Sequence, residues 1–187
     1  MRPQRESTRN SDCAYFVSTQ TAGRKPFFRH DRWARLLLAT LDHYSKTSFT
    51  LHAYVIMPDH LHLLITPKES LEKSVQLIKG GFSFRVKRDL EWNSEIWQSG
   101  FTDHRIRDEE DWHRHLQYIR QNPVDAKLTD DVALYEFVAV PRGAFPRGLK
   151  PQNPDNTVVR AEARTLHQMQ CPEKTPHFRL PKTERYR

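Results

Sequence analysis

The stretch YVIMPDHLHLLITP, residues 54–67, predicts the centre of a β-hairpin. FTLHAYVIM (49–57) is rich in β-branched and aromatic side chains, and HLHLLIT (60–66) follows as its antiparallel partner. Pro58 and Asp59 supply the turn chemistry between the two strands. The second strand also carries two histidines that are separated by a single leucine.

These histidines, His60 and His62, share one face of their strand because side chains alternate along a strand. Leu61, Leu63 and Ile65 share the other face and are expected in the core. The two imidazoles can therefore converge on one divalent ion, provided that a third ligand comes from elsewhere in the chain. A pair of half-exposed histidines without a metal fits the same short pattern equally well.

Strand and helix patterns alternate along the chain and favour an α+β fold. Residues 14–21 and 101–107 are predicted strands, and apolar positions at helical spacing predict helices over 30–44, 70–90 and about 109–121. The resulting order is β-α-β-β-α-β-α. It indicates a ferredoxin-like antiparallel sheet with the first two helices on one face, which leaves the other face for a ligand or for the third helix.

The ends and the interior of these helices carry further signals. Asp31 is expected to cap the first helix, and Asp108 with Asp111 is expected to form a capping pair for the third. Gly80 and Gly81 fall inside the second helix, where each glycine costs about 1 kcal/mol relative to alanine. A kink, or the close approach of another backbone, is therefore expected at this pair.

The third helix carries polar side chains beside its apolar stripe. His115, Tyr118 and Asn122 lie together there, and Tyr118 and Asn122 are one turn apart. The amide oxygen of Asn122 can complete a metal site with the histidine pair if this helix packs on the free sheet face. The alternative is an aromatic side chain at the stripe's edge and a polar residue that ends the helix before Pro123.

Composition points to an acidic partner outside any membrane. The 187 residues carry a net charge of +7, which favours nucleic acid because Lys and Arg displace counterions from phosphates. No apolar run approaches the roughly 20 residues that span a bilayer, and the start lacks the apolar block of a secretion signal, so a cytoplasmic location is expected. Cys13 and Cys171 suit neither a disulfide framework nor a metal site and are expected to be free thiols.

The charge is uneven along the chain. Residues 141–187 hold ten Lys and Arg against four Asp and Glu, and seven of the twelve prolines. This composition predicts a basic, largely irregular tail. Residues 1–13 are polar and lack periodicity, which predicts a disordered arm, and residues 14–140 are expected to form the folded domain between these two segments.

Three blocks in this order resemble the single-tyrosine HUH transposases and, within them, the REP-associated tyrosine transposases, which act on repetitive extragenic palindromes. They are MPDHLHLLI (57–65), IWQSGFTDHRIR (96–107) and YIRQNPVDAKL (118–128), and the resemblance covers roughly residues 14–140. Lys127 stands where this family tends to have Gly, and Asp125 replaces a residue that is usually basic.

The resemblance implies the roles of four residues and a cofactor. By position, His60 and His62 are metal ligands, Asn122 is the third ligand, and Tyr118 is the nucleophile, with Mg²⁺ or Mn²⁺ as the metal. Tyr118 would then form a 5′-phosphotyrosine with DNA. His115 is a possible accessory that assists removal of the phenol proton.

The expected partner is single-stranded DNA, including the foot of a hairpin, bound by a monomer or a homodimer. Arg85, Lys87 and Arg88 are candidate phosphate contacts. His104, beside Asp103, fits a phosphate contact or a partner of a metal ligand, but a packed structural pair is the stronger expectation. Two other functions remain open: a binding module for single-stranded nucleic acid that does not cleave, and a hydrolytic nuclease in which the tyrosine only packs.

Overall fold

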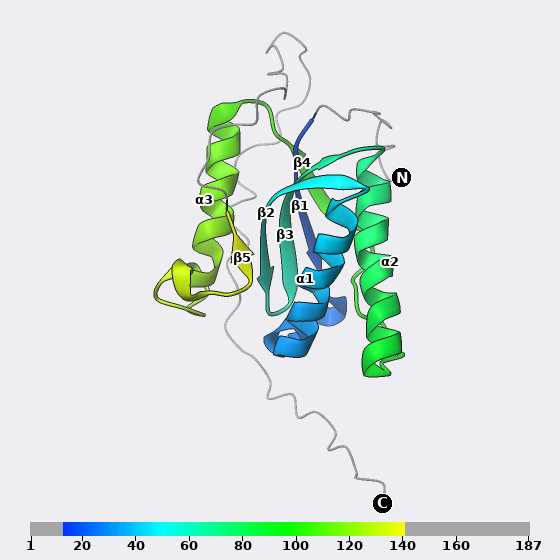
Figure 1. Cartoon of the computed structure of the whole chain (residues 1–187). Helices are drawn as coiled ribbons and strands as arrows, with labels where there is room; N and C mark the ends of the chain where they lie inside the picture. Colours follow the sequence, from blue (N-terminus) through cyan, green and yellow to red (C-terminus); the bar gives the residue numbers. More distant parts are fainter. Residues whose placement is uncertain (1–12, 141–187) are drawn as a thin grey trace, which may run out of the picture. The chain divides into compact units, whose positions relative to one another are not determined.

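The computed structural model describes residues 13–140, in which an antiparallel sheet separates the helices into two layers (Figure 1). The strand order is β4-β1-β3-β2-β5. The strands are β1 (Tyr15–Gln20), β2 (Phe49–Met57), β3 (His60–Pro67), β4 (Thr102–Arg105) and β5 (Val138–Ala139). The α-helices of this region are α1 (Asp31–Ser45), α2 (Leu71–Leu90) and α3 (Glu109–Asp125).

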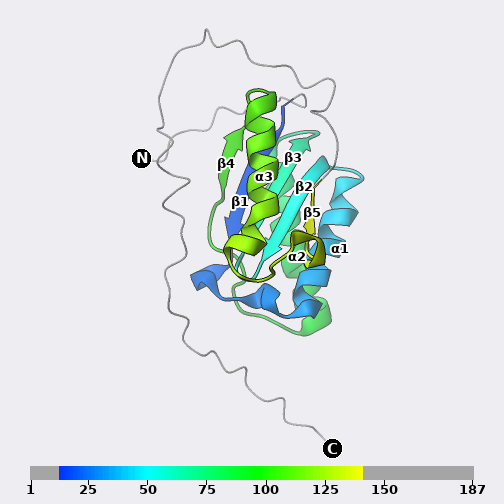
Figure 2. The same ribbon diagram turned by 90° about the vertical axis from the view of Figure 1, so that its left-hand side faces the viewer.

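The ferredoxin-like prediction is confirmed. Helices α1 and α2 cover one face of the sheet, and α3 lies across the other (Figures 1 and 2). Each neighbouring pair of strands is antiparallel, and the four predicted strands take the order β4-β1-β3-β2. The short strand β5 joins the edge formed by β2, because Tyr54 pairs with Ala139 and Val55 with Val138.

The hairpin of β2 and β3 forms as its sequence predicts. Met57 pairs with His60 across the two-residue turn, and Val55 pairs with His62. The three aliphatic residues of β3 that were expected in the core are buried between the sheet and the α1–α2 layer: Leu61, Leu63 and Ile65. The alternate positions of β3 therefore face α3.

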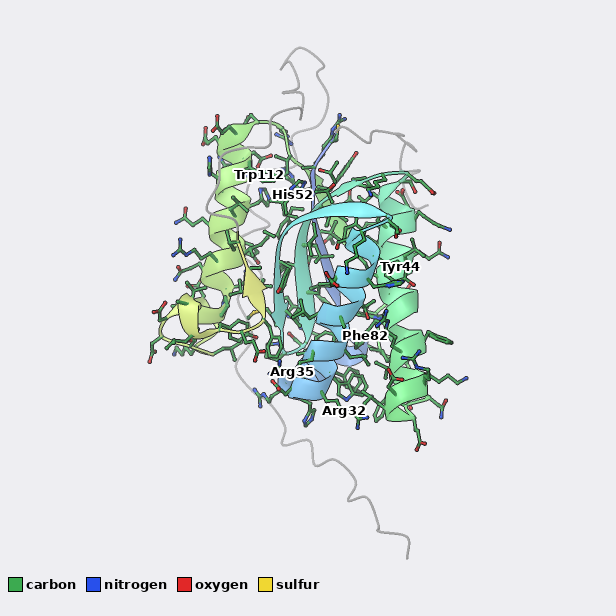
Figure 3. All side chains as sticks on the ribbon, viewed as in Figure 1. Arg32, Arg35, Tyr44, His52, Phe82 and Trp112 are labelled. Atoms are coloured by element: carbon green, nitrogen blue, oxygen red, sulfur yellow. The ribbon has the colours of Figure 1, made fainter. Side chains whose placement is uncertain are left out.

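A second apolar cluster forms beneath α3. Trp112, Leu116 and Ile119, the apolar stripe of this helix, pack there against Phe16 and Leu64 of the sheet. Trp112 also meets the edge of His52 on β2, with ring centroids 5.0 Å apart (Figure 3). The free sheet face of the sequence prediction is thus covered by α3, which places the polar edge of the helix against the strands.

The cap of α1 differs from the prediction. His30, with φ −87° and ψ 117°, occupies the N-cap position, and Asp31 is the first helical residue. Asp31 accepts a hydrogen bond of 2.8 Å from Nε of Arg35, one turn later. It therefore stabilises the helix start through its charge in the first turn rather than through a cap.

Helix α2 runs unbroken from Leu71 to Leu90 through Gly80 and Gly81. The close approach at the pair comes from a side chain: a Cβ at Gly81 would lie 2.4 Å from Cε2 of Tyr44, whereas a Cβ at Gly80 would meet nothing within 4 Å. Tyr44 lies in the last turn of α1, on the side that faces α2 (Figure 3). The absence of a side chain at Gly81 thus leaves room for the ring of Tyr44.

Helix α3 does not end before Pro123 but continues to Asp125. Beyond it, the N–H of Leu128 bonds to the carbonyl of Pro123, and the N–H of Lys127 bonds to that of Val124. This pair of bonds closes the helix in a Schellman motif, whose left-handed position is held by Lys127 with φ 54°. Glycine would adopt this φ angle without the steric cost that lysine pays.

The two ends of the chain fall largely outside the described residues. The predicted arm over 1–13, except Cys13, and the predicted tail over 141–187, including Cys171, lie there. Cys13 itself is buried, and its sulfur accepts a hydrogen bond from Arg105 at 2.7 Å, so this one residue packs with the folded domain. Within residues 13–140, no helix combines the length and the apolar character needed to cross a membrane.

Candidate active site

The structure brings His60, His62 and Tyr118 together between β3 and α3. The imidazole rings of His60 and His62 meet edge to face with centroids 4.8 Å apart. The phenol ring of Tyr118 meets the ring of His62 in the same manner, at 5.3 Å. A histidine pair and a tyrosine from segments far apart in the sequence therefore form one cluster at the sheet surface.

His60 is held by the turn residue before it. Its Nδ1 lies 2.6 Å from Oδ1 of Asp59, and the other carboxylate oxygen of Asp59 accepts a hydrogen bond of 3.0 Å from Nε of Arg24. Burial alone would raise the pKa of Asp59, but these bonds from His60 and Arg24 outweigh it and hold the pKa below its ordinary value. The ionised carboxylate orients the imidazole and leaves Nε2 of His60 free to act as a metal-ligand atom.

His62 is buried, and its Nδ1 has no hydrogen-bond partner among the residues that the structure describes. Burial lowers the pKa of His62 well below its ordinary value, and the neighbouring His60 and Arg24 lower it further against the opposing effect of Asp59. The ring is therefore neutral near pH 7. A neutral imidazole with an unsatisfied nitrogen is the form that binds metal ions.

Asn122 is linked to the cluster through its helix. Its amide Nδ2 donates to the backbone carbonyl of Tyr118 at 3.0 Å, a bond that does not use the amide oxygen. Both residues are half-buried on α3. Among the described contacts, Asn122 is thus tied to Tyr118 and not directly to the histidines.

Phe16 of β1 connects the rings of this region and was not singled out by the sequence. Its ring stacks on His62 at 5.2 Å and also contacts Tyr118 at 5.6 Å and His115 at 4.8 Å. The alternation of side chains along β1 could have indicated this position, since Phe16 points to the same sheet face as His62. Phe16 fixes the position of the rings around it but offers no polar atom.

His115 contacts the ring of Phe16, which in turn stacks on His62. It is buried, and its Nδ1 donates to the carbonyl of Asp111 at 2.8 Å. Burial is the main cause that lowers the pKa of His115. Its described contacts lead to Asp111, His104 and Phe16, so the structure does not bring it against the phenol of Tyr118.

A second polar cluster joins β4 to the start of α3. His104, Asp111 and His115 each offer one possible metal-ligand atom, and these three atoms lie within 4.8 Å of one another. His104 forms a packed pair with Asp111, whose Oδ2 lies 2.7 Å from its Nε2. Asp108 caps α3 as predicted by accepting from the N–H of Asp111, but the carboxylate of Asp111 turns toward His104 instead of returning to the cap.

The sequence contained a signal for this second cluster. Asp111 and His115 are four residues apart on one helix, which places their side chains on the same face, and His104 lies near the end of the strand before that helix. The capping role of Asp111 accounted for its position, so the spacing was not interpreted as a set of ligands.

The candidate phosphate contacts lie away from the tyrosine. Arg85, Lys87 and Arg88 belong to α2, on the opposite face of the sheet from α3 (Figures 1 and 2). Lys87 and Arg88 are exposed, and Arg88 also pairs with Asp89 and lies over the exposed ring of Phe84. The structure does not bring these side chains to the active-site cluster.

Comparison with known proteins identifies related sequences over most of the domain. A family model described as "Transposase IS200 like" matches residues 10–122. A putative REP-associated tyrosine transposase of Haemophilus influenzae is 36% identical over 97 residues, which cover 46% of this chain and 53% of that protein. The REP-associated tyrosine transposase of Escherichia coli is 30% identical over 105 residues, which cover 52% of this chain and 61% of that protein.

The matches thus span between half and two thirds of the length of these curated relatives. Among solved structures, a REP-associated tyrosine transposase bound to a REP hairpin has a TM-score of 0.63 at 20% identity. The match covers 86% of this chain and 99% of that one. At this level of identity, the likeness is one of fold alone.

Proposed function

Since this chain belongs to the family of IS200-like transposases, we propose that it cleaves and rejoins single-stranded DNA at hairpins of repetitive extragenic palindromes, with Tyr118 as the nucleophile. The observation that carries the proposal is the contact between Tyr118 and His62, at 5.3 Å between ring centroids. It places a phenol next to a histidine pair that is suited to hold a divalent ion.

The residues present fit such an ion. His62 has a buried nitrogen without a partner among the described residues, and His60 is oriented by a carboxylate, an arrangement common among metal-binding histidines. Mg²⁺ and Mn²⁺ both accept a site that is completed by oxygen ligands, and imidazoles favour Mn²⁺. When bound, the cation would neutralise a non-bridging phosphate oxygen and orient the phosphate for in-line attack.

Asn122 is proposed as the third ligand because strand β3 and helix α3 run in opposite directions across the site. Strand β3 begins, and helix α3 ends, at the same end of the sheet (Figure 1). The step from His62 back to His60 covers about 7 Å along a strand, and the step from Tyr118 to Asn122 covers about 6 Å along a helix. Because the two steps have the same direction and similar lengths, Asn122 should lie beside His60 as Tyr118 lies beside His62.

The reaction then follows from the position of the phenol. The oxygen of Tyr118 attacks the phosphorus, the bond from phosphorus to the 3′ oxygen breaks, and the released 3′ oxygen takes up a proton. The product is a 5′-phosphotyrosine that keeps the energy of the phosphodiester for a later strand transfer. The ring contacts of Phe16 and His62 hold Tyr118 in place for this attack.

The substrate is proposed from the surroundings of the phenol and from the relatives. Tyr118 is half-buried between a helix and a sheet, so a strand free of its complement reaches it more readily than a duplex does. A structural relative of this fold has been solved with a REP hairpin. Arg85, Lys87 and Arg88 would contact DNA away from the active site, because α2 lies on the other sheet face.

The contact between the histidine pair and the tyrosine forms within one chain. His62 and Tyr118 of the same chain are in contact, so neither has to come from a second subunit. We therefore propose that cleavage takes place within a single subunit. Dimers, where they form, would not need to exchange α3.

The test is a covalent protein–DNA adduct. The full chain, with Mn²⁺ and single-stranded DNA from the hairpins that flank its own gene, should yield an adduct that survives a denaturing gel. Tyr118→Phe should abolish the adduct while DNA binding persists. Tyr54→Phe, at a half-buried tyrosine on β2, is the matched control and should leave the adduct at its normal level.

Two other outcomes would each replace the proposal. If Tyr118→Phe still cuts the DNA, water is the nucleophile and the protein is a hydrolytic nuclease. If the unaltered chain binds the hairpins but cuts none of them with Mg²⁺ or Mn²⁺, it is a binding module.

A further inference from the structure

A second group of metal-binding side chains lies apart from the proposed active site. It consists of His104 on β4 and of Asp111 and His115 on the first turns of α3. Nε2 of His104 lies 2.7 Å from Oδ2 of Asp111, and Nδ1 of His115 lies 3.3 Å from Oδ1 of the same carboxylate. The two imidazole rings stack, with centroids 4.7 Å apart.

Neighbouring groups hold this cluster in place. The backbone N–H of Arg107 donates to Oδ2 of Asp111 at 3.1 Å, and Phe16 packs against the ring of His115. Asp111 and His115 are buried, whereas the side chain of His104 is 36% exposed. The cluster is thus ordered on its inner side and open to solvent on the side of His104.

We propose that His104, Asp111 and His115 form a second divalent-metal site, of the two-imidazole, one-carboxylate type that suits Zn²⁺, and that this site fastens β4 to the start of α3. It is separate from the proposed catalytic pair, since it shares no residue with His60 and His62. Zn²⁺ binds imidazole and carboxylate ligands at four-coordinate sites, where water fills the remaining position.

The charge of Asp111 suits a bound cation. Burial would raise the pKa of Asp111, but the hydrogen bond from His104 and the N–H of Arg107 outweigh it, so the carboxylate is ionised. Metal-binding side chains must be deprotonated, so acid should weaken the site. The exposed guanidinium of Arg114, 3.9 Å from Oδ1 of Asp111, is a positive charge that opposes a bound cation.

Local spacing also favours the site. Only six residues separate His104 from Asp111, and Asp111 and His115 share one helix face. The entropy lost in closing so short a loop is small. A bound ion would thus join a strand to the following helix. One of its ligands, His115, contacts the Phe16 ring that also contacts Tyr118.

The test compares Zn²⁺ binding to the full chain and its variants by equilibrium dialysis, at neutral pH. His104→Ala removes the most exposed ligand, so it is the variant expected to fold. It should bind one tight equivalent fewer than the unaltered chain, whereas His113→Ala, at an exposed histidine of the same helix, should bind as many. The sequence also contains His167, Cys171 and His177, which are potential Zn²⁺ ligands. The test therefore depends on the difference in bound Zn²⁺ between variants and not on the total number of Zn²⁺ ions bound.

A second measurement uses a variant that lacks the active-site histidines, so its result does not depend on metal binding at the active site. In the double variant His60→Ala and His62→Ala, added Zn²⁺ should still raise the melting temperature, and added Co²⁺ should still give a visible absorption band. Adding His104→Ala to the double variant should weaken Zn²⁺ binding at least about tenfold. Equal numbers of Zn²⁺ equivalents in the unaltered chain and in His104→Ala would overturn the proposal and leave the adduct assay unaffected.

Discussion

The carboxylate of Asp59 lies 2.6 Å from Nδ1 of His60 and so fixes the ring of a proposed metal ligand from the residue next to it in the chain. This pair begins β3 directly after the hairpin turn. The turn that sets the register of β2 and β3 therefore also supplies the group that orients the imidazole.

Asp59→Asn should weaken Mn²⁺ binding by about tenfold, because partners that orient a metal-binding histidine typically contribute between ten- and a hundredfold to affinity. The amide keeps the size of the side chain but loses its charge. Isothermal titration calorimetry measures the change. Asp42→Asn, at an exposed aspartate that pairs with Lys46, is the control. Unchanged affinity in Asp59→Asn would mean that His60 is not a ligand or needs no support.

Gly80→Ala and Gly81→Ala should have opposite effects on stability. Alanine at Gly80 meets open space and should stabilise the protein by about 1 kcal/mol, the usual gain in a helix interior. Alanine at Gly81 would lie 2.4 Å from Cε2 of Tyr44 and should destabilise it by about 1–2 kcal/mol. Urea unfolding measures both changes. In a Tyr44→Ala background, Gly81→Ala should become as favourable as Gly80→Ala, and a persistent loss there would exclude the tyrosine as the cause.

Lys127→Gly should stabilise the protein by about 0.5–1 kcal/mol, since lysine pays a steric cost at a left-handed position that glycine does not. Lys127 has φ 54° in the Schellman motif that ends α3. Lys46, the C-cap residue of α1, has φ −72°, so Lys46→Gly should destabilise the protein and serves as the control. Thermal unfolding of both variants decides the point. A loss of stability in Lys127→Gly would show that the lysine makes a contact that outweighs its backbone strain.

His52 should make folding stability depend on pH. Its ring lies against Trp112 and Oγ1 of Thr66, and burial lowers its pKa from 6.5 to about 4. The unfolded ring takes up a proton below about pH 6.5, whereas the folded ring remains neutral until about pH 4. The contribution is therefore complete above pH 6.5 and is lost as the pH falls toward 4.

Because the ring is partly exposed, we expect a loss of about 1–2 kcal/mol between about pH 7 and pH 5, less than the full shift implies. Urea unfolding at the two pH values measures it. His62 and His115 act in the same direction, so the comparison with His52→Asn isolates the effect. That variant should show a smaller pH dependence than the unaltered chain, and His113→Asn should show the same dependence. An equal slope in His52→Asn would assign the pH effect to other groups.

Much of the fold follows from local patterns. The alternation of HLHLLI predicted that Leu61 and Leu63 enter the core while His60 and His62 face the other way, and the structure agrees. The helical spacing of Trp112, Leu116 and Ile119 likewise predicted the face that α3 buries. The expected meeting of Tyr118 with the histidine pair depended on one further assumption, that α3 packs on the free sheet face, and this packing is observed.

Helix ends were less predictable, because several residues compete for the same cap. His30 takes the extended conformation that Asp31 was expected to take, and Pro123 is accommodated inside α3. Missing one backbone N–H is tolerable near the end of a helix where the following residues close a Schellman motif. Such outcomes depend on the chain beyond the helix, which a local pattern does not include.

The sequence by itself determined the hairpin, its two faces and the polar edge of the last helix, since strand and helix periods assign each side chain a direction. Only the tertiary structure decided which side chains meet. Phe16 from β1 came to lie among His62, Tyr118 and His115, and Asp111 turned from its cap toward His104. Periodicity describes one element at a time, whereas these contacts join separate elements and exist only once the sheet and α3 have packed.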